Sequence, residues 1–184
     1  YTIGIDLDIP QQQERFSVKQ YEDLERDEAQ EEQDADQELQ HHYKQNKPMV
    51  KDNTCQHFAS ILGGVRILKG VVPDSVCVVA KPRTKVPITI KGIETHSPLV
   101  NTALFSFEQG HDGKYLNLGE TGALLKEIPP FREALEKQNI GVTAIHTHWL
   151  ENKPEGLMYI HWMSVEDPFE FAQKTAKAWQ KALA

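Results

Sequence analysis

The chain lacks any run of about 18 apolar residues, and it has no basic segment followed by an apolar one at its start. A membrane-crossing helix needs about 20 consecutive, mostly apolar residues, so we do not expect a membrane-spanning segment. Glycine-rich phosphate loops and the H-E-x-x-H and G-x-S-x-G motifs are also missing. Nucleotide cofactors, zincin proteolysis and hydrolase-fold chemistry therefore gain no support.

Positive charge is scarce, and the net charge of −7 is unevenly distributed. Residues 1–52 hold 14 Asp and Glu against 6 Lys and Arg, whereas residues 53–184 hold 13 against 14. Neither part has the basic surplus with which proteins bind phosphate backbones. Nucleic acid is therefore not an expected partner.

Cysteine is limited to Cys55 and Cys77, which are 22 positions apart and outside any C-x-x-C pattern. This spacing signals neither a zinc knuckle nor a dense disulfide framework. The apolar neighbours in "TCQHFASIL" and "SVCVVA" favour two buried thiols. One disulfide in an oxidising compartment is the alternative.

The length of 184 residues fits one ordinary domain with an appendage. Residues 1–52 form the appendage, an acidic N-terminal arm whose Gln, Glu and Asp content cannot bury enough apolar surface to fold alone. We expect a solvated helix or disorder over residues 11–46, and an additional strand at residues 1–9 that could pair with another sheet edge. Because the chain begins with Tyr1, we expect either a removed leader or a trimmed sequence.

Residues 53–184 change to the pattern of a compact domain. Thr54 is predicted to cap a short helix over 55–62, which Gly63 and Gly64 end. Strands are predicted at the β-branched runs "VRILKGVV", "SVCVVAKP" and "VPITIKGI", and at "NTALFSFEQ" and "KYLNLGETGALL".

The second half of the domain predicts a β-α-β-β-α order from Tyr115 onward. Pro129 and Pro130 open a helix, a hairpin follows over residues 141–162, and Asp167 and Pro168 start the last helix as N-cap and first-turn proline. The apolar positions of that last helix are spaced by 3 and 4: Phe169, Ala172, Ala176, Trp179 and Leu183. The order predicts an α+β fold with an antiparallel or mixed sheet and helices packed on one face.

Three of the eight histidines lie in the predicted hairpin. Residues two apart share one face of a strand, so His146 and His148 point to the same side. If the turn is centred near residues 153–154, His161 on the partner strand lies opposite His146, and Tyr159 opposite His148, within one two-residue step of register. Three imidazoles can then converge, and a three-histidine zinc site with an open fourth position is the arrangement that activates water.

Glu120 is a candidate fourth member because it follows a glycine in the preceding strand. It could complete a metal shell, hold a histidine by a hydrogen bond, or act as a general base, provided that its strand lies beside the hairpin. The alternatives are an inert, half-exposed histidine face and a different strand register. The remaining histidines are expected to face solvent: His41, His42, His57, His96 and His111.

The residues from about 55 to 184 resemble the bacterial LppY/LpqO family, a domain family of unknown function. The resemblance rests on "GVTAIHTHWL", on "LMYIHW" and on the following Asp167 and Pro168, with Glu120 matching the acidic residue after glycine. It departs at Thr147, where the family more often has Asn, on the strand face opposite the histidines. The resemblance implies export or attachment to the cell envelope rather than a cytoplasmic location, and no established activity.

The leading hypothesis is a domain that binds zinc or another divalent metal through His146, His148 and His161, with Glu120 as the catalytic candidate if the domain is an enzyme. Metal-assisted hydrolysis is then the expected chemistry. Whether it is an enzyme stays open. The rivals are a non-catalytic envelope domain that binds a small molecule, and a structural module that self-associates as a homo-oligomer.

Overall fold

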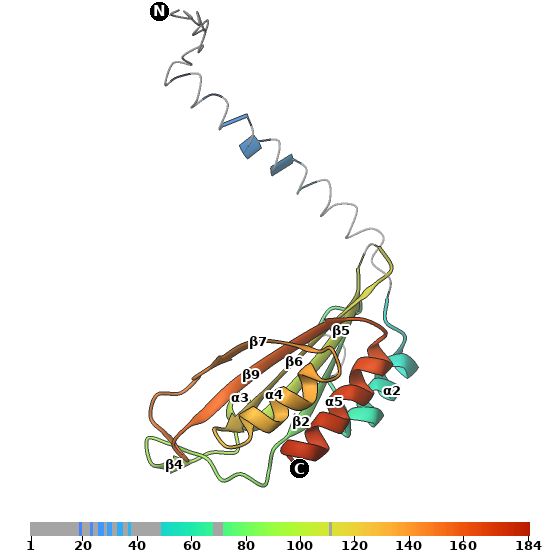
Figure 1. Cartoon of the computed structure of the whole chain (residues 1–184). Coiled ribbons are helices and arrows are strands. Elements are labelled where there is room, and N and C mark those ends of the chain that lie inside the picture. Colours follow the sequence, from blue (N-terminus) through green and yellow to red (C-terminus); the bar gives the residue numbers. More distant parts are fainter. Residues whose placement is uncertain are drawn as a thin grey trace, which may run out of the picture. The chain divides into compact units, whose positions relative to one another are not determined.

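The computed structural model describes residues 49–67, 72–110 and 112–184, together with scattered helical positions between residues 19 and 37. The chain divides into two units, residues 1–46 and 47–184, and the elements labelled in Figure 1 belong to the second. The strand predicted at residues 1–9 lies outside the described residues, as does most of the arm. The domain boundary at residues 52 and 53 stays a prediction.

An antiparallel sheet of six strands is the main element of this second unit, in the order β1-β2-β5-β6-β9-β7. Its central strands follow strict alternation: Ala103, Phe105 and Phe107 of β5 are buried on one face, as expected for a pleated strand. The strands are β1 (Val65–Arg66), β2 (Val76–Pro82), β5 (Thr102–Gln109), β6 (Tyr115–Leu124), β7 (Gly141–His146) and β9 (Leu157–Val165).

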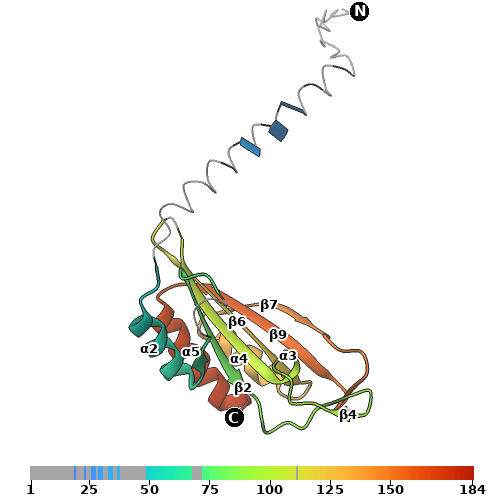
Figure 2. The same ribbon diagram turned by 180° about the vertical axis from the view of Figure 1, so that it is seen from behind.

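Three helices cover one face of this sheet, as Figures 1 and 2 show from opposite sides: α2 (Asp52–Leu62), α4 (Ile128–Glu136) and α5 (Pro168–Ala182). The Asp167 carboxylate accepts hydrogen bonds from the backbone N–H groups of Phe169 and Glu170, and Pro168 occupies the first turn. The predicted start of the last helix is therefore confirmed. So is the predicted α+β fold, with an antiparallel sheet and its helices on one face.

Aromatic rings build the core between the helices and the sheet. Phe131 of α4 meets Trp162 of β9 edge to face at 5.1 Å, and Phe105 of β5 meets Trp179 of α5 at 6.0 Å. The apolar face predicted for α4 is confirmed, because Phe131, Leu135 and the following Ile140 are buried.

The buried face of α5 is rotated from the predicted stripe. Of the predicted positions, Ala172, Trp179 and Leu183 are buried, whereas Phe169 and Ala176 are only half-buried. The helix also buries four residues outside the predicted stripe: Pro168, Phe171, Thr175 and Ala178. The prediction assumed that α5 packs along a single line of apolar residues. Because α5 packs against both α2 and α4, its buried face is wider than that line.

Cys55 and Cys77 form a disulfide that joins α2 to β2. Both residues are buried, but the favoured expectation of two free thiols was wrong. Apolar neighbours indicate burial and carry no information on the distance between two cysteines. Here the Cα atoms lie 5.5 Å apart, which is within disulfide reach.

A smaller sheet and a short helix cover part of the opposite face of the large sheet. The small sheet has the order β4-β3-β8, from Thr89–Ile90 (β3), Ile93–Glu94 (β4) and Asn152–Lys153 (β8), and the short helix is α3 (Pro98–Asn101). Ile88 and Val100 pack there against Leu157 and Tyr159 of β9. Since β8 lies within the connection from β7 to β9, that connection is not the simple polar turn that the sequence predicted.

Other boundaries differ in detail. Helix α2 begins at Asp52, and its N-cap, Lys51, makes no side-chain hydrogen bond, so Thr54 is not the cap. Gly63 ends α2 in the left-handed conformation, as predicted. The run "VRILKGVV" pairs as a strand only at Val65–Arg66, and residues 68–71 are not described. Among the described residues, no helix is both long and apolar enough to cross a bilayer.

Candidate metal centre

Strands β7, β9 and β6 are neighbours in the large sheet (Figure 2). They place His146, His161 and Glu120 on the face away from the helices, since Ile160 and Trp162 of β9 face the helix-side core. His146 of β7 pairs with Tyr159 of β9, and His161 of β9 lies between Ala144 of β7 and Glu120 of β6. The sequence predicted His161 opposite His146 within one two-residue step, and the observed register differs from that pairing by one such step. A two-residue step keeps side chains on the same face, so the histidines still converge.

A bulge in β7 between Val142 and Ala144 shifts the register and leaves Thr143 as the additional residue. Strand β7 ends at His146, so His148 lies just beyond it. The His148 ring stacks on Tyr159, with ring centroids 3.5 Å apart and planes tilted by 10°. Stacking on β9 therefore holds His148 on the same side as His146, although no strand pairing does.

The ring nitrogens of the three histidines come close together. Nε2 of His146 lies 2.8 Å from Nε2 of His161, and the nearest ligand atoms of His146, His148 and His161 all lie within 4.8 Å of one another. Two nitrogens bound to one tetrahedral zinc, with bonds of about 2.0 to 2.1 Å, stand about 3.3 Å apart. Small shifts of the rings would therefore bring the three nitrogens to ligating distance.

The opposite nitrogen of His161 faces a carboxylate. Nδ1 of His161 lies 3.4 Å from Oε2 of Glu120, whose side chain is about one third exposed. A carboxylate in this position favours the tautomer that carries hydrogen on Nδ1 and leaves the Nε2 lone pair free. Glu120 is thus placed to orient His161 rather than to meet the other two histidines.

Partial burial also affects the protonation of the cluster. It lowers the pKa of His161, an effect that the Glu120 carboxylate opposes and His146 reinforces. It likewise lowers the pKa of His148 below the usual histidine value, with a contribution from His146. Both effects favour neutral imidazole, which is the form that binds metals.

Tyr159, on whose ring His148 stacks, is held in place by burial and by a hydrogen bond. Its side chain is 3% exposed, and its hydroxyl donates a 2.8 Å hydrogen bond to the Val100 carbonyl of α3. Burial raises the pKa of this phenol, so it stays protonated. His146 and His148 are by contrast exposed, so the three nitrogens are open to solvent and to ligands.

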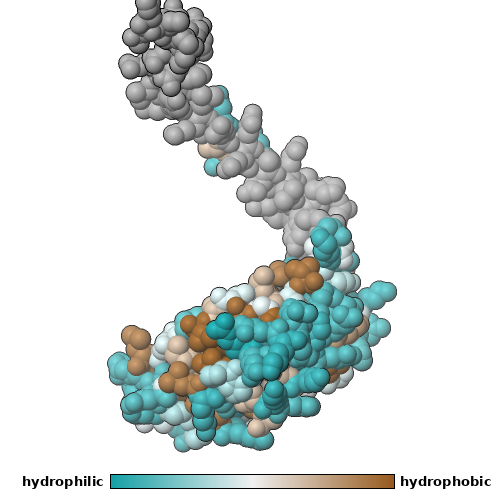
Figure 3. Space-filling view, in the orientation of Figure 1, coloured by the Kyte–Doolittle hydropathy of each residue, from teal (hydrophilic) through white to brown (hydrophobic). Residues whose placement is uncertain are grey.

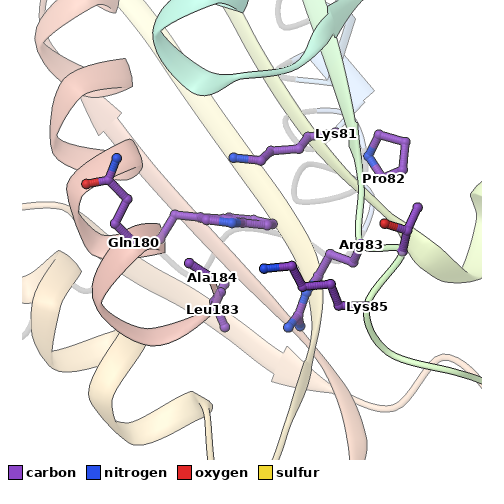
Figure 4. Close-up of a pocket in the computed structure, with 9 residues that line it drawn as sticks. Lys81, Pro82, Arg83, Lys85, Gln180, Leu183 and Ala184 are labelled. Carbon is purple, nitrogen blue, oxygen red and sulfur yellow. The ribbon is translucent and has the colours of Figure 1, made fainter.

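A separate cavity of about 280 Å³ lies where the end of β2 approaches the end of α5. Lys81 and Lys85 extend toward Gln180 and Leu183 in Figure 4. Burial lowers the pKa of Lys81, whose ammonium lies 4.6 Å from the Trp179 ring centroid. This cavity was not predicted from the sequence, although the alternating cations in "AKPRTK" were a signal for it.

The two other histidines that the structure describes lie outside the site. His57 and His96 are exposed, as predicted. His57 contacts the Phe169 ring at 4.8 Å, and His96 lies near Glu94. His41, His42 and His111 lie outside the described residues.

Comparison with known proteins places this chain in one family. Residues 56–181 match the family model described as a Domain of Unknown Function (DUF1259). The match covers more than half of the chain, so the protein belongs to this family, and it includes the disulfide-bonded Cys77, Glu120 and all three clustered histidines. No curated protein matches the chain. No solved structure matches it either. The relation to LppY/LpqO proteins stays a prediction.

Proposed function

We propose that this domain binds one divalent metal ion, zinc fitting best, through His146, His148 and His161. The observation that carries the proposal is the convergence of three imidazoles from two strands and a connecting segment, with their ligand atoms within 4.8 Å of one another. Imidazole ligands suit zinc, copper, nickel and iron. A set of three neutral nitrogens with an open side fits zinc in a four-coordinate site.

Metal-assisted hydrolysis is the chemistry that this donor set supports best. A zinc ion held by His146, His148 and His161 would supply Lewis-acid chemistry, because such a site leaves one position for water or substrate and lowers the pKa of that water toward neutrality. The protein's own contribution is then to fix the imidazoles. Tyr159 supports His148 by stacking, and Glu120 orients His161 through Nδ1. The 3.4 Å contact favours this orienting role for Glu120 over that of a general base.

Metal analysis of protein purified without a histidine tag tests the proposal. We expect about one zinc per chain after dialysis, and a loss of most of it in the His146→Ala/His148→Ala variant. The matched control is His57→Ala/His96→Ala, which removes two exposed histidines outside the cluster and should keep the zinc. Negligible metal in both wild-type protein and the cluster variant would overturn the metal hypothesis.

A second measurement separates catalysis from a structural role. Cobalt(II) in place of zinc has a visible spectrum that responds to coordination number, and addition of acetohydroxamic acid should change it if one position is open. An unchanged spectrum would indicate a closed shell and contradict the hydrolytic proposal, while leaving metal binding intact.

A non-catalytic ligand-binding domain is the second candidate. The cavity beside Trp179, with Lys81 and Lys85 in its lining, favours it because two ammonium groups there suit a small organic anion. Retention of benzoate by wild-type protein but not by the Lys81→Met/Lys85→Met variant would support it, and equal retention would contradict it.

We also propose that the protein functions in an oxidising compartment, outside the cytoplasm. The Cys55–Cys77 disulfide supports this location, because disulfides persist in secreted and envelope proteins and are rare in reducing cytosol. Thiol labelling of protein taken directly from its native cells tests the idea. Two labelled thiols per chain would contradict it.

A further inference from the structure

On one side of the histidines, the same sheet face continues into an apolar surface that no element of residues 49–67, 72–110 or 112–184 covers. Toward one end of β9, α3 and the small sheet cover Leu157 and Tyr159, which are nearly inaccessible. Toward the other end, Met163 is 42% and Val165 is 57% exposed. The histidines thus lie at the border between a covered and an open part of one face.

Strand pairing arranges the open part in rows. Glu120 pairs with His161, then Leu118 with Met163, and then Leu116 with Val165, each row two residues further along β6 and β9. Side chains two apart share a face, so these three rows lie on the same side. We name the apolar side chains of the second and third rows, Leu116, Leu118, Met163 and Val165, the apolar strip.

The apolar strip is long enough for an extended chain. Glu120 and Leu116 are four positions apart, which corresponds to about 13 Å along a strand. Leu118 is 41% exposed, so it offers contact surface to a ligand. Ser106 of β5 pairs with Leu118 and Glu108 with Leu116, so polar groups border the strip on that side. Figure 3 shows the opposite, helix-covered side of the domain, where hydrophilic residues dominate over α4 and α5.

From this arrangement we infer that the site takes an amphiphile, a medium-chain acyl compound whose polar head binds at the three histidines while its chain lies on the apolar strip. This inference rests on the proposed metal site. The covering elements determine the direction of the acyl chain. Helix α3 and the small sheet block the path past Tyr159, whereas Met163 on the other side is exposed. An exposed apolar surface continuous with a ligand site suits the apolar part of that ligand.

Two hydroxamic acids with the same head group test the inference on zinc-loaded protein. Acetohydroxamic acid reports the head-group site alone, and octanohydroxamic acid adds six methylenes. Complete burial of one methylene raises affinity about fourfold, and contact on one side only raises it about twofold. We therefore expect octanohydroxamic acid to bind at least about 20-fold more tightly in calorimetry.

The variant Leu118→Ser/Met163→Ser should lose most of this chain-length gain and keep the affinity for acetohydroxamic acid. The matched control, Ile93→Ser/Leu125→Ser, removes two exposed apolar side chains outside the apolar strip and should keep the gain. Equal binding of both hydroxamic acids to wild-type protein would overturn the acyl-chain inference and leave the metal site standing. Binding of neither would overturn both.

A second copy of the chain is the competing occupant of the apolar strip. Molar mass measured by light scattering separates the two cases. A wild-type dimer that becomes a monomer in Leu118→Ser/Met163→Ser would assign the strip to self-association and overturn the inference. An unchanged molar mass together with the loss of the chain-length gain supports it.

Discussion

At the scale of single residues, His161 uses its two ring nitrogens in different directions. Nδ1 faces Oε2 of Glu120 at 3.4 Å, and Nε2 faces His146 at 2.8 Å. A histidine with a carboxylate on one nitrogen is held in one tautomer and one orientation, which raises its basicity as a ligand. Glu120 is therefore a positioning residue in the proposed metal centre.

Replacement of this carboxylate should weaken metal binding without abolishing it. We predict that Glu120→Ala lowers zinc affinity about 10- to 100-fold, measured by competition with a chromophoric chelator. Glu120→Gln keeps an acceptor oxygen for Nδ1 and should recover much of that loss. The control Glu155→Ala removes an exposed carboxylate outside the centre. Equal zinc affinity in wild-type protein and Glu120→Ala would show that the 3.4 Å contact has no role in binding.

The residues of this centre were largely predictable, because alternation along a strand assigns each side chain to a face before any partner is known. His146, His148 and His161 were chosen in that way, whereas Glu120 was chosen because it follows a glycine in the strand before the hairpin. Their pairing was not predictable, because the bulge that holds Thr143 has no clear sequence signal. The stacking of His148 on Tyr159 also depends on the path of the chain beyond β7, which alternation does not describe.

At the scale of secondary-structure elements, one ion pair joins the end of β2 to the connection between β6 and α4. Arg83 donates two hydrogen bonds of 3.0 Å to the Glu127 carboxylate and a third to the Gly122 carbonyl. Glu127 also accepts a hydrogen bond from the Leu124 N–H. Both charged side chains are mostly buried, with Arg83 8% and Glu127 15% exposed. If one of them is removed, water therefore cannot fully solvate the charge that remains.

This ion pair should make stability depend on pH. Burial disfavours the charged Glu127 carboxylate, but hydrogen bonds from Arg83 and Leu124 outweigh it and hold its pKa below the usual glutamate value. The stabilisation is therefore complete above the unfolded pKa of about 4.3 and is lost as pH falls through the lower, folded pKa.

We predict that Glu127→Gln lowers the free energy of unfolding at pH 7 by about 3 kcal/mol, because Arg83 is left without a counter-charge. The difference from wild-type protein should shrink below about pH 4. Denaturant unfolding at several pH values measures it, with Glu133→Gln as a control in an exposed ion pair. A difference that stays constant from pH 7 to pH 3 would contradict the assigned role.

Elements with a complete local signal were predicted well. The start of α5 has an N-cap aspartate and a first-turn proline, and both act as expected. By contrast, the run "VPITIKGI", predicted as one strand, holds β3 and the beginning of β4 on either side of a turn, and β8 was not predicted because two residues present no periodicity. The pairing of β3 with β8 joins segments about 60 residues apart, and its energy comes from packing against β9 rather than from local preference.

At the scale of the whole described domain, the two faces of the large sheet differ. Helices α2, α4 and α5 bury one face, while α3 and the small sheet cover only part of the other. The sequence predicted the first layer because amphipathic helices need an apolar partner surface. It did not predict the partial cover, and that cover is what puts the histidines at the border of an open apolar strip.

The Cys55–Cys77 disulfide closes a loop of the chain between α2 and β2, two elements in different layers. A crosslink across 22 positions restricts the unfolded chain and stabilises the folded state by about 3 kcal/mol. We predict that Cys55→Ala/Cys77→Ala lowers the melting temperature by about 10 °C. Calorimetry with and without dithiothreitol measures this effect.

Reductant should lower the melting temperature of wild-type protein toward that of the variant. It should leave the variant unchanged, since the variant has no disulfide to reduce. An identical melting temperature for oxidised wild-type protein and the variant would show that α2 is held by the Phe58 and Leu62 packing alone.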